Sequence, residues 1–375
     1  MREAMFYAAA ADDHVLCTLC PHQCLIPPDR LGVCGVRFNL EGKLVTLVDR
    51  TVVAHAVEPI EKKPLFHFFP GSTAYSIATV GCNLHCRFCQ NWGISQVRKH
   101  GPIEASKPGL LAEPRARLRA AQARILGDER TPEQIVAAAR AAGSRSIAYT
   151  FTEPTVFFEL AHETACRAHE AGLKNVFVSN GYIGDEALQQ IAPVLDAINV
   201  DLKFACDADY RRICGGRLAP ILRAIRRYHE LGVWVEVTSL LVTGLNDSDA
   251  AIATMAQCVA SVAPTIPWHV SRFFPAHRMT DRQPTPIDRL DRAVAIGREA
   301  GLQFVYQGNV PDPERESTRC PRCGRELIRR VGPIVLSNHI TPAHRCPQCD
   351  LTIAGVGLGD GRARTEKQPL TWESP

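Results

Sequence analysis

Short apolar runs alternate with longer amphipathic segments from residue 76 to residue 307. The segments between the runs are about 10 to 15 residues long and have helical spacing, so the alternation predicts β-α units and a parallel sheet. The predicted strands are residues 76–80, 146–151, 174–179, 197–203, 233–241, 268–273 and 303–307. Six or seven units are fewer than the eight of a closed barrel, so we expect an α/β fold with a partial (β/α)6-type TIM barrel.

Capping sequences mark two of the predicted helix starts. Thr131-Pro132-Glu133-Gln134 is a capping box with proline at the first helical position, and residues 285–288 (T-P-I-D) predict a similar start for the last helix. Residues 97–129 differ in composition and include a basic run from Pro114 that is helical by propensity. We interpret them as an insertion, which is either a solvated surface helix or a basic contact patch for a partner.

The two ends of the chain differ from the barrel pattern. Residues 44–57 predict two short strands of a small sheet, and residues 58–72 predict a proline-bounded connector into the barrel. The expected division is a cysteine-rich extension with a small sheet (1–70), the barrel (71–310), a zinc-ribbon-like segment (311–358) and a disordered polar tail (359–375).

Composition excludes several classes of protein. The chain has 375 residues, a formal charge of +4 and 46% hydrophobic residues, and no apolar run approaches the ~18 residues of a membrane span. The charge is too mild to indicate a nucleic-acid or membrane partner. Because the N-terminus lacks an apolar signal region of ~7 to 15 residues, we expect a cytoplasmic protein.

Fifteen cysteines in a long chain without a signal peptide favour metal or redox use over disulfides. Cys82, Cys86 and Cys89 follow the first barrel strand with the spacing C-x3-C-x2-C. Three thiolates leave one metal position open, which suits an iron-sulfur cluster whose fourth iron binds a substrate or cofactor. The alternative is a zinc knuckle that borrows His85 or a remote ligand.

Two further groups of four cysteines can each saturate a metal site. The first contains Cys17, Cys20, Cys24 and Cys34, for which we expect a structural metal, either zinc or an iron-sulfur cluster; the alternative is a reduced, metal-free segment. The second contains Cys320, Cys323, Cys346 and Cys349, as two C-x2-C pairs with 22 residues between them. This pattern predicts a zinc ribbon, with a second electron-transfer cluster as the alternative and His344 as a competing ligand.

Polar residues recur where the predicted strands end, which is the catalytic edge of such barrels. They include Thr152-Glu153-Pro154, Ser179-Asn180-Gly181, Asp201-Leu202-Lys203, Thr238-Ser239 and Ser271-Arg272, with Pro275 and His277 beyond. Each could be an ordinary cap or turn residue, but the recurrence favours a binding site. Cys206 and Cys214 follow one of these strand ends, so a catalytic or partner-facing thiol is possible there.

The cysteine trio, with Phe88 before its last cysteine, resembles the cluster motif of the radical S-adenosylmethionine (radical SAM) superfamily. Further segments resemble the pyruvate formate-lyase activating enzyme branch and, within it, the radical SAM component of the AmmeMemoRadiSam system. They include C-P-H-Q-C, E-P-I-E-K-K-P-L-F-H-F, G-C-N-L-H-C-R-F-C-Q-N-W, S-I-A-Y-T-F-T-E-P, V-F-V-S-N-G-Y, N-V-D-L-K and P-W-H-V-S-R-F-F-P.

The resemblance implies a 4Fe-4S cluster on Cys82, Cys86 and Cys89, with SAM chelating the unique iron. It also implies reductive cleavage of SAM to methionine and a 5′-deoxyadenosyl radical that abstracts hydrogen from a substrate. The SAM-binding residues that it implies are Glu153, Asn180, Gly181, Asp201, Lys203 and His277. Both glycines of the activases' G-G-E-P segment are absent here, and Val178 replaces the first aspartate of their D-T-N-G segment, which argues against a cation site built from two carboxylates.

The resemblance favours an enzyme that activates a partner protein, as glycyl-radical activases do. It points to Memo-like and AMMECR-like proteins as associates and to flavodoxin or ferredoxin as the electron donor. The alternatives are radical modification of a small molecule or of a partner's side chain. From a different class, the alternative is a zinc-only binding module in which all three cysteine groups are structural.

Overall fold

A curved eight-stranded sheet forms the centre of the molecule. The computed structural model describes residues 2–96, 114–310 and 312–360. Within them, the sheet has the order β16-β15-β14-β13-β12-β11-β9-β8; all neighbours are parallel except β8, which is antiparallel to β9. The strands are β8 (Ala54–Pro59), β9 (Thr73–Ala78), β11 (Ser146–Tyr149), β12 (Lys174–Ser179), β13 (Ala197–Asp201), β14 (Trp234–Leu241), β15 (Trp268–Arg272) and β16 (Val305–Gly308). The partial barrel is confirmed, and its seven parallel strands are the larger of the two predicted numbers.

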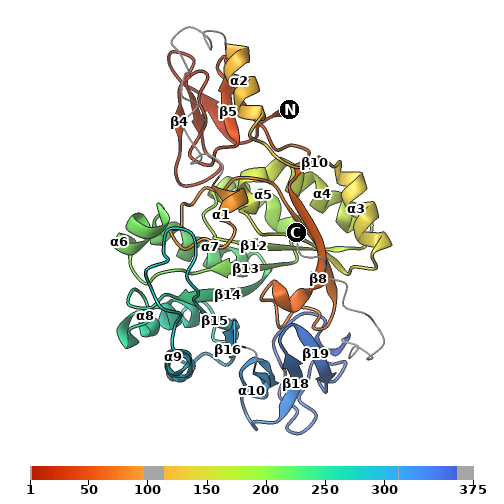
Figure 1. The fold of residues 1–375 in the computed structure, drawn as a ribbon. Helices are drawn as coiled ribbons and strands as arrows, with labels where there is room; N and C mark the ends of the chain where they lie inside the picture. Colours follow the sequence, from red (N-terminus) through yellow and green to blue (C-terminus); the bar gives the residue numbers. More distant parts are fainter. Residues whose placement is uncertain (1, 97–113, 311, 361–375) are drawn as a thin grey trace.

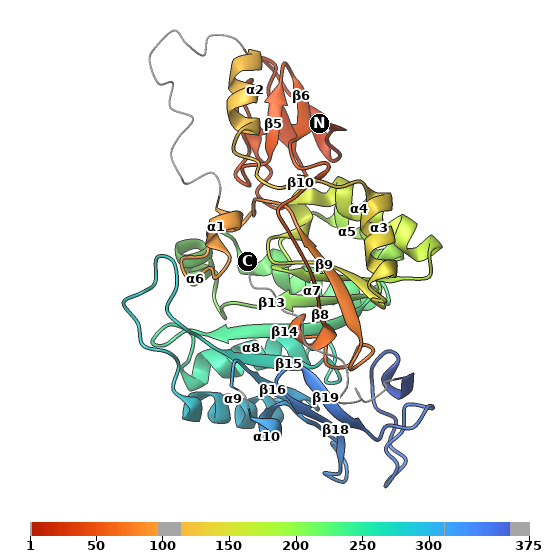
Figure 2. The same cartoon turned by 45° about the vertical axis from the view of Figure 1, so that its right-hand side comes forward.

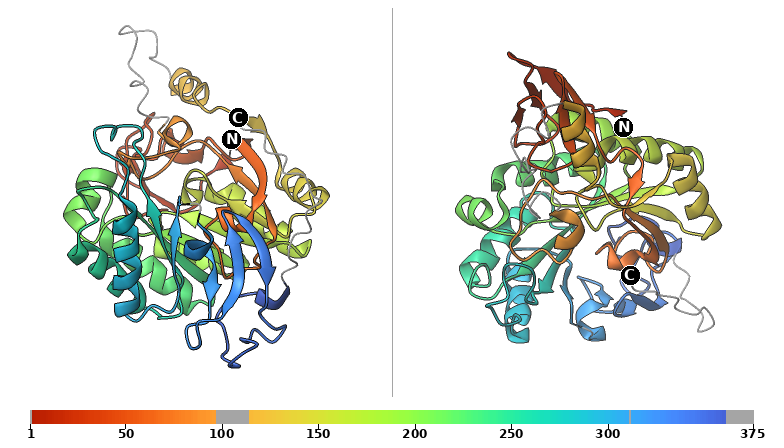
Figure 3. Two further views of the ribbon diagram at one scale, coloured as in Figure 1. Left: turned by 60° about the horizontal axis from the view of Figure 1, so that its bottom comes forward. Right: turned by 45° about the horizontal axis from the view of Figure 1, so that its top comes forward.

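Helices cover the outer face of this sheet, as both views of Figure 3 show. The longer ones are α3 (Pro132–Ala141), α4 (Phe158–Glu170), α5 (Asp185–Ile191), α7 (Leu218–Glu230), α8 (Asp249–Ala260) and α9 (Ile287–Glu299). Their apolar residues follow helical spacing: on α7, Ile221, Ala224, Ile225 and Tyr228 are buried, so one stripe of the helix packs on the sheet. Shorter turns join the units: α1 (Trp92–Ser95), η3 (Pro154–Phe157), η4 (Ala192–Val194), α6 (Asp207–Asp209), the π-helical η5 (Tyr210–Cys214) and α10 (Pro313–Glu316).

One of the two predicted capping sequences acts as a cap. The Thr131 hydroxyl accepts from the Gln134 amide, and the Gln134 side chain accepts from the Thr131 amide, so the capping box of α3 is confirmed. The predicted start of α9 is confirmed, because the helix begins at Ile287, but the predicted cap is wrong, because Thr285 makes no cap there. Its hydroxyl instead donates to the Leu241 carbonyl and accepts from the Phe273 amide, which ties together the ends of β14 and β15.

The N-terminal region forms two small sheets at one end of the barrel, at the top of Figure 1. One contains β1 (Arg2–Glu3), β6 (Lys43–Thr46) and β5 (Arg37–Leu40), and the other β2 (Tyr7–Ala9), β3 (Val15–Cys17) and β4 (Leu25–Ile26). The helix predicted from Pro114 is present as α2 (Pro114–Gln122) and packs Leu118 and Ala121 against Phe38. Residues 97–113 of the predicted insertion lie outside the described residues.

Residues 44–57 form strands, as predicted, but these strands do not all pair within one small sheet. Only β6 belongs to the small sheet. The short β7 (Thr51–Val52) pairs with β10 (Asp128–Glu129), and β8 joins the edge of the barrel. Alternation of side chains identifies a strand, whereas its partner depends on residues that are distant in sequence.

The predicted connector, residues 58–72, leads from the end of β8 into β9, and its middle part packs inside one end of the barrel. It contains η1 (Ile60–Lys62), and Phe66 and His67 donate their backbone amides to the buried Glu236 carboxylate of β14. The C-terminal segment covers the same end with a sheet of β17 (Thr318–Arg319), β18 (Glu326–Val331) and β19 (Ile334–Asn338), followed by η6 (Leu358–Asp360). Phe66 packs with Tyr306 and Leu327 in the core shared between them.

The N-terminal sheets and the C-terminal sheet therefore lie at opposite ends of the barrel, as Figure 2 shows. In the part of the chain that the structure describes, none of the helices has the length and apolar character of a membrane-crossing segment. The tail is predicted to be disordered, and its residues from 361 onward lie outside the described part of the chain.

Candidate functional site

The three cysteines of the C-x3-C-x2-C motif lie on a loop between β9 and α1. Gly81 begins this loop with a φ of +101°, a conformation that side-chain-bearing residues rarely adopt. Cys82, Cys86 and Cys89 all line a cavity of about 450 Å³ at the carboxyl edge of the sheet. Catalytic sites of β/α barrels lie at this edge, and the volume is typical of a site for a small molecule or cofactor.

The π-helical turn η5 packs against the cysteine loop and accepts two backbone hydrogen bonds from it. The His85 amide donates to the Cys214 carbonyl at 2.6 Å, and the Arg87 amide donates to the Ile213 carbonyl at 3.1 Å. The Cys214 side chain is fully buried, and its hydrogen bond to Cys86 lowers the pKa of Cys86. Sequence reasoning left Cys214 as one of two ambiguous thiols, and only the contact between the two loops identifies it as the neighbour of a motif cysteine.

The remaining two motif cysteines also have polar neighbours. The Asn180 side-chain amide lies 3.7 Å from Cys82 Sγ, and the Ser95 hydroxyl lies 3.2 Å from Cys89 Sγ. Burial, followed by the nearby Glu153 carboxylate, raises the pKa of Cys82 well above its usual range. Hydrogen bonds to cysteine sulfurs are one of the means by which proteins set the potential of an iron-sulfur cluster. Nothing in the sequence pattern identified Ser95.

The spacing of the three sulfurs fits a multi-metal cluster better than a single ion. Four sulfurs around one zinc at about 2.3 Å would lie about 3.8 Å from one another. Within the described residues, these three sulfurs do not come within 4.8 Å of one another as a group. In a cubane cluster each thiolate binds a different iron, so wider spacing around an open cavity is expected. The residues of this loop therefore fit a 4Fe-4S cluster.

Glu153 is a buried carboxylate at the start of η3, and it lines the same cavity. Its Oε1 accepts hydrogen bonds from the Thr155 amide, the Thr155 hydroxyl and the Ser179 hydroxyl, and its Oε2 accepts one from the Asn180 amide at 2.8 Å. Burial raises the pKa of Glu153 despite these donors. Because a carboxylate oxygen can accept more than one hydrogen bond, Oε2, which accepts one from Asn180, can accept another from a ligand.

Asp201 and Lys203, at the end of β13, also line the cavity. They form an ion pair with a distance of 2.8 Å between Asp201 Oδ2 and Lys203 Nζ. Burial opposes the charge of Lys203, but the negative charges of Asp201 and Cys86 outweigh it and raise the pKa of Lys203 well above its usual range. Lys203 therefore remains a cation inside the cavity.

Two of the predicted SAM-binding residues do not line this cavity. Gly181 adopts a φ of +70° behind Asn180, where a methyl group would lie 2.9 Å from Val200 Cγ1. It shapes the turn after β12 rather than contacting the cavity. His277 stacks on Trp92 with ring centroids 5.3 Å apart, at the outer side of the cysteine loop. The other four, Glu153, Asn180, Asp201 and Lys203, share the cavity with the cysteines.

A second cavity, of about 810 Å³, adjoins the first along the interior of the barrel. Six residues line both cavities: Lys62, Pro64, Gln90, Leu240, Ser271 and Asn309. Among these six, Lys62 follows β8 and Asn309 follows β16, the two edge strands of the sheet. Phe274, which is 41% exposed, lines the second cavity, whereas Trp92, which is 40% exposed at the start of α1, lines neither cavity.

The four C-terminal cysteines gather around one point. Among the described residues, theirs is the one group of cysteine, histidine or acidic side chains whose ligand atoms all lie within 4.8 Å of one another. The sulfurs of Cys320 and Cys349 are 3.5 Å apart, and those of Cys323 and Cys346 are 3.7 Å apart. These distances are close to the ~3.8 Å of a tetrahedral zinc-sulfur site. His344 is not part of this group.

Comparison with known proteins agrees with this picture. The model of the radical SAM superfamily matches residues 76–258. An uncharacterized protein of Methanocaldococcus jannaschii, MJ0808, is 41% identical over 331 residues, which cover 88% of this chain and 92% of that protein.

Among solved structures, a radical SAM methyltransferase from Sphaerobacter thermophilus is 19% identical, with a TM-score of 0.46 over 69% of this chain and 71% of that one. A domain of a pyruvate-formate lyase-activating enzyme from Bacteroides vulgatus is 20% identical, with a TM-score of 0.39 over 44% of this chain and 99% of that one. The zinc-only binding module is not supported, because members of the matched family perform radical chemistry with a 4Fe-4S cluster and SAM. The chain belongs to the radical SAM superfamily.

Proposed function

We propose that this protein cleaves SAM reductively at a 4Fe-4S cluster held by Cys82, Cys86 and Cys89. One observation carries the proposal: these three cysteines share a cavity of about 450 Å³ with polar side chains from the ends of successive parallel strands. When bound, the cluster would supply the electron for breaking a carbon-sulfur bond of SAM, which would yield methionine and a 5′-deoxyadenosyl radical. The residues around it bind and orient SAM.

The polar groups in the cavity match the parts of SAM. The acceptor position left on Glu153 Oε2 suits the SAM amino group, and the Lys203 ammonium suits its carboxylate. Asn180 and Asp201 offer hydrogen-bonding groups for the ribose hydroxyls. Gly181 and His277 do not contact SAM in this proposal. Gly181 shapes the turn that carries Asn180, and His277 stacks on Trp92.

The proposed substrate is a segment of a partner protein, as in the activating-enzyme branch that the motifs resemble. The 810 Å³ cavity adjoins the SAM site, and the exposed Phe274 on its lining offers an apolar contact for a chain that enters there. Memo-like and AMMECR-like proteins are the proposed associates, and a flavodoxin or ferredoxin is the proposed electron donor. A small-molecule substrate is the alternative outcome.

The test is anaerobic reconstitution with iron and sulfide, reduction, and addition of SAM. We expect 5′-deoxyadenosine from the native protein and none from Cys86→Ala, whereas Cys258→Ala, which changes a cysteine on α8 away from the cavity, should keep the activity. Absence of 5′-deoxyadenosine from the reconstituted native protein would refute the proposal. Incubation with deuterated candidate partners then identifies the substrate by the deuterium that enters 5′-deoxyadenosine.

The two cysteine-rich ends, residues 1–70 and 311–358, are proposed as accessory units that carry metal. Zinc is the proposed ion at Cys320, Cys323, Cys346 and Cys349. Against the effect of burial, hydrogen bonds from backbone amides lower the pKa of Cys346 to about 7, which favours the thiolate that zinc requires. The cytoplasm is the proposed location, because its reducing conditions keep thiols available for metal binding.

A further inference from the structure

The three cysteine groups differ in how their sulfurs are arranged. The C-terminal four gather within 4.8 Å of one another, as a single tetrahedral ion requires. Among the described residues, no three of Cys17, Cys20, Cys24 and Cys34 gather in this way, and neither do the three motif cysteines. The N-terminal four therefore resemble the cluster-binding loop of this same chain, and not its single-ion site.

The N-terminal four surround a small closed cavity. All four cysteines line it, together with Leu19, His22, Ile26, Gly32, Val33, Arg37, Asn83 and Val156. Its volume is about 20 Å³, far below the ~300 to 1,000 Å³ of a typical small-molecule site. A separate organic ligand does not fit such a space. The occupant must instead bond directly to the sulfurs, since metal-sulfur bonds of about 2.3 Å are much shorter than non-bonded contacts.

Arg37 provides an independent indication of an occupant. Its side chain is 1% exposed and lines the cavity, and its Nε-H has no hydrogen-bond partner. Its two terminal nitrogens are already used, one by the Met5 carbonyl and the other by both oxygens of Glu159. A buried donor without a partner costs about 1 to 3 kcal/mol. An anionic group of sulfur atoms at this place would supply the acceptor that Nε lacks.

We propose that Cys17, Cys20, Cys24 and Cys34 bind an iron-sulfur cluster rather than zinc. Four cysteine thiolates are the usual ligand set of both two-iron and four-iron clusters. Inorganic sulfides fill the space between sulfurs that are too far apart for one ion. The Arg37 guanidinium then donates to a cluster sulfur, and hydrogen bonds and charge of this kind tune the reduction potential.

The site lies directly beside the loop that carries Cys82. The Asn83 carbonyl accepts a hydrogen bond from His22 at 2.7 Å, and its side chain accepts one at 2.9 Å from Asn180, whose amide also lies beside Cys82 Sγ. The two loops also touch at Gly81, where a methyl group would lie 3.0 Å from the Cys34 carbonyl oxygen. Close packing therefore connects the two groups of cysteines.

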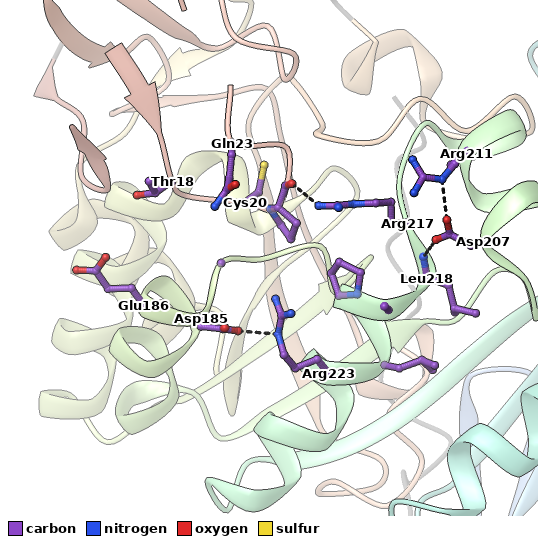
Figure 4. Close-up of a pocket in the computed structure, with 15 residues that line it drawn as sticks. Thr18, Cys20, Gln23, Asp185, Glu186, Asp207, Arg211, Arg217, Leu218 and Arg223 are labelled. Carbon is purple, nitrogen blue, oxygen red and sulfur yellow. Dashed lines mark hydrogen bonds and ion pairs between the residues drawn. The ribbon is translucent and has the colours of Figure 1, made fainter. Parts of the chain in front are cut away.

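On its other side the site reaches an open groove of about 830 Å³. Cys20 lines both the closed cavity and this groove, and Figure 4 shows its sulfur near Gln23, with Arg217 and Arg211 on the facing side. A one-electron centre at this position lies between the groove and the Cys82 loop, so it can accept an electron from a reduced carrier in the groove and pass it inward. This relay role rests on the proposed function, whereas the cluster site itself does not.

The test removes the motif cluster and asks whether iron remains. The variant with Cys82, Cys86 and Cys89 all changed to alanine, isolated and reconstituted without oxygen, should retain two or four irons per chain with matching sulfide, a visible charge-transfer absorption, and one zinc. Adding Cys20→Ser and Cys24→Ser should remove that iron. Adding Cys166→Ser, which changes an isolated cysteine on α4, should not.

Two zinc ions and no iron in the triple variant would overturn the proposal, and so would a variant that keeps its single zinc and native circular dichroism but binds no iron. A second readout uses the native protein. Electron paramagnetic resonance of the reduced form should show broadening by two interacting clusters, and this broadening should disappear in the triple variant. A single, unbroadened cluster signal in fully reconstituted native protein would contradict the inference without bearing on SAM cleavage.

Discussion

Replacing Glu236 with glutamine should destabilise the barrel severely. The carboxylate is fully buried and accepts four hydrogen bonds: from the amides of Phe66 and His67 at 3.0 and 2.7 Å, from Trp234 Nε1 at 3.0 Å and from His269 Nε2 at 2.7 Å. Glutamine has one acceptor oxygen, so two of these donors would face an NH₂ group. At about 1 to 3 kcal/mol for each unsatisfied buried donor, the expected loss is about 2 to 6 kcal/mol.

The assay is urea unfolding of the reconstituted protein, with Glu299→Gln as the matched control. The Glu299 side chain is 65% exposed and pairs with Arg292 at the surface, so the same substitution there should change the unfolding free energy by about 0 to 1 kcal/mol. A loss below about 1 kcal/mol for Glu236→Gln would refute the idea that this carboxylate holds residues 66 and 67 inside the barrel.

The difference in unfolding free energy between the native protein and Glu236→Gln should also depend on pH. Burial opposes the charge, but the hydrogen bond and charge of His269 outweigh it and lower the pKa of Glu236. A lowered carboxyl pKa contributes stability that is present above the unfolded value of about 4.3 and is lost as the pH falls through the folded value. The difference between native protein and variant should therefore shrink on acidification below about pH 4.

Three further outcomes are expected. His67 is buried between the Ala354 carbonyl and the Tyr306 hydroxyl, and burial lowers its pKa to about 4. The free energy of unfolding should therefore fall by about 3 kcal/mol as the pH drops from 6.5 to 4, and His67→Gln should reduce this dependence on pH. Glu153→Gln should weaken SAM binding about 10- to 100-fold in calorimetry, as expected for a charged hydrogen bond worth about 1.5 to 3 kcal/mol; unchanged affinity would exclude its contact with SAM. Cys346→Ser should remove one zinc per chain and make residues 318–338 susceptible to limited proteolysis, whereas full retention of zinc would exclude the four-cysteine site.

Local sequence patterns determined much of the barrel. The seven parallel strands lie within a few residues of their predicted positions, because a run of apolar residues between helical segments forms a buried strand whatever its neighbours are. The capping box at Thr131 is equally local, since both of its hydrogen bonds join residues three apart. The spacing of Cys82, Cys86 and Cys89 was sufficient to indicate a cluster with an open position, because three ligands on one short loop remain close together in any fold.

Contacts between distant segments decided the rest. Sequence could not show that residues 54–59 join the barrel, or that Phe66 and its neighbours pack inside it. Nor could it show that Cys214 lies beside Cys86. Each of these depends on contacts between residues that are far apart in the chain. The same holds for the two groups of four cysteines, which look alike as ligand sets in the sequence. Only the folded chain gathers one group around a point and spreads the other around a cavity beside Asn83, because the distance between sulfurs is set by the backbones that carry them.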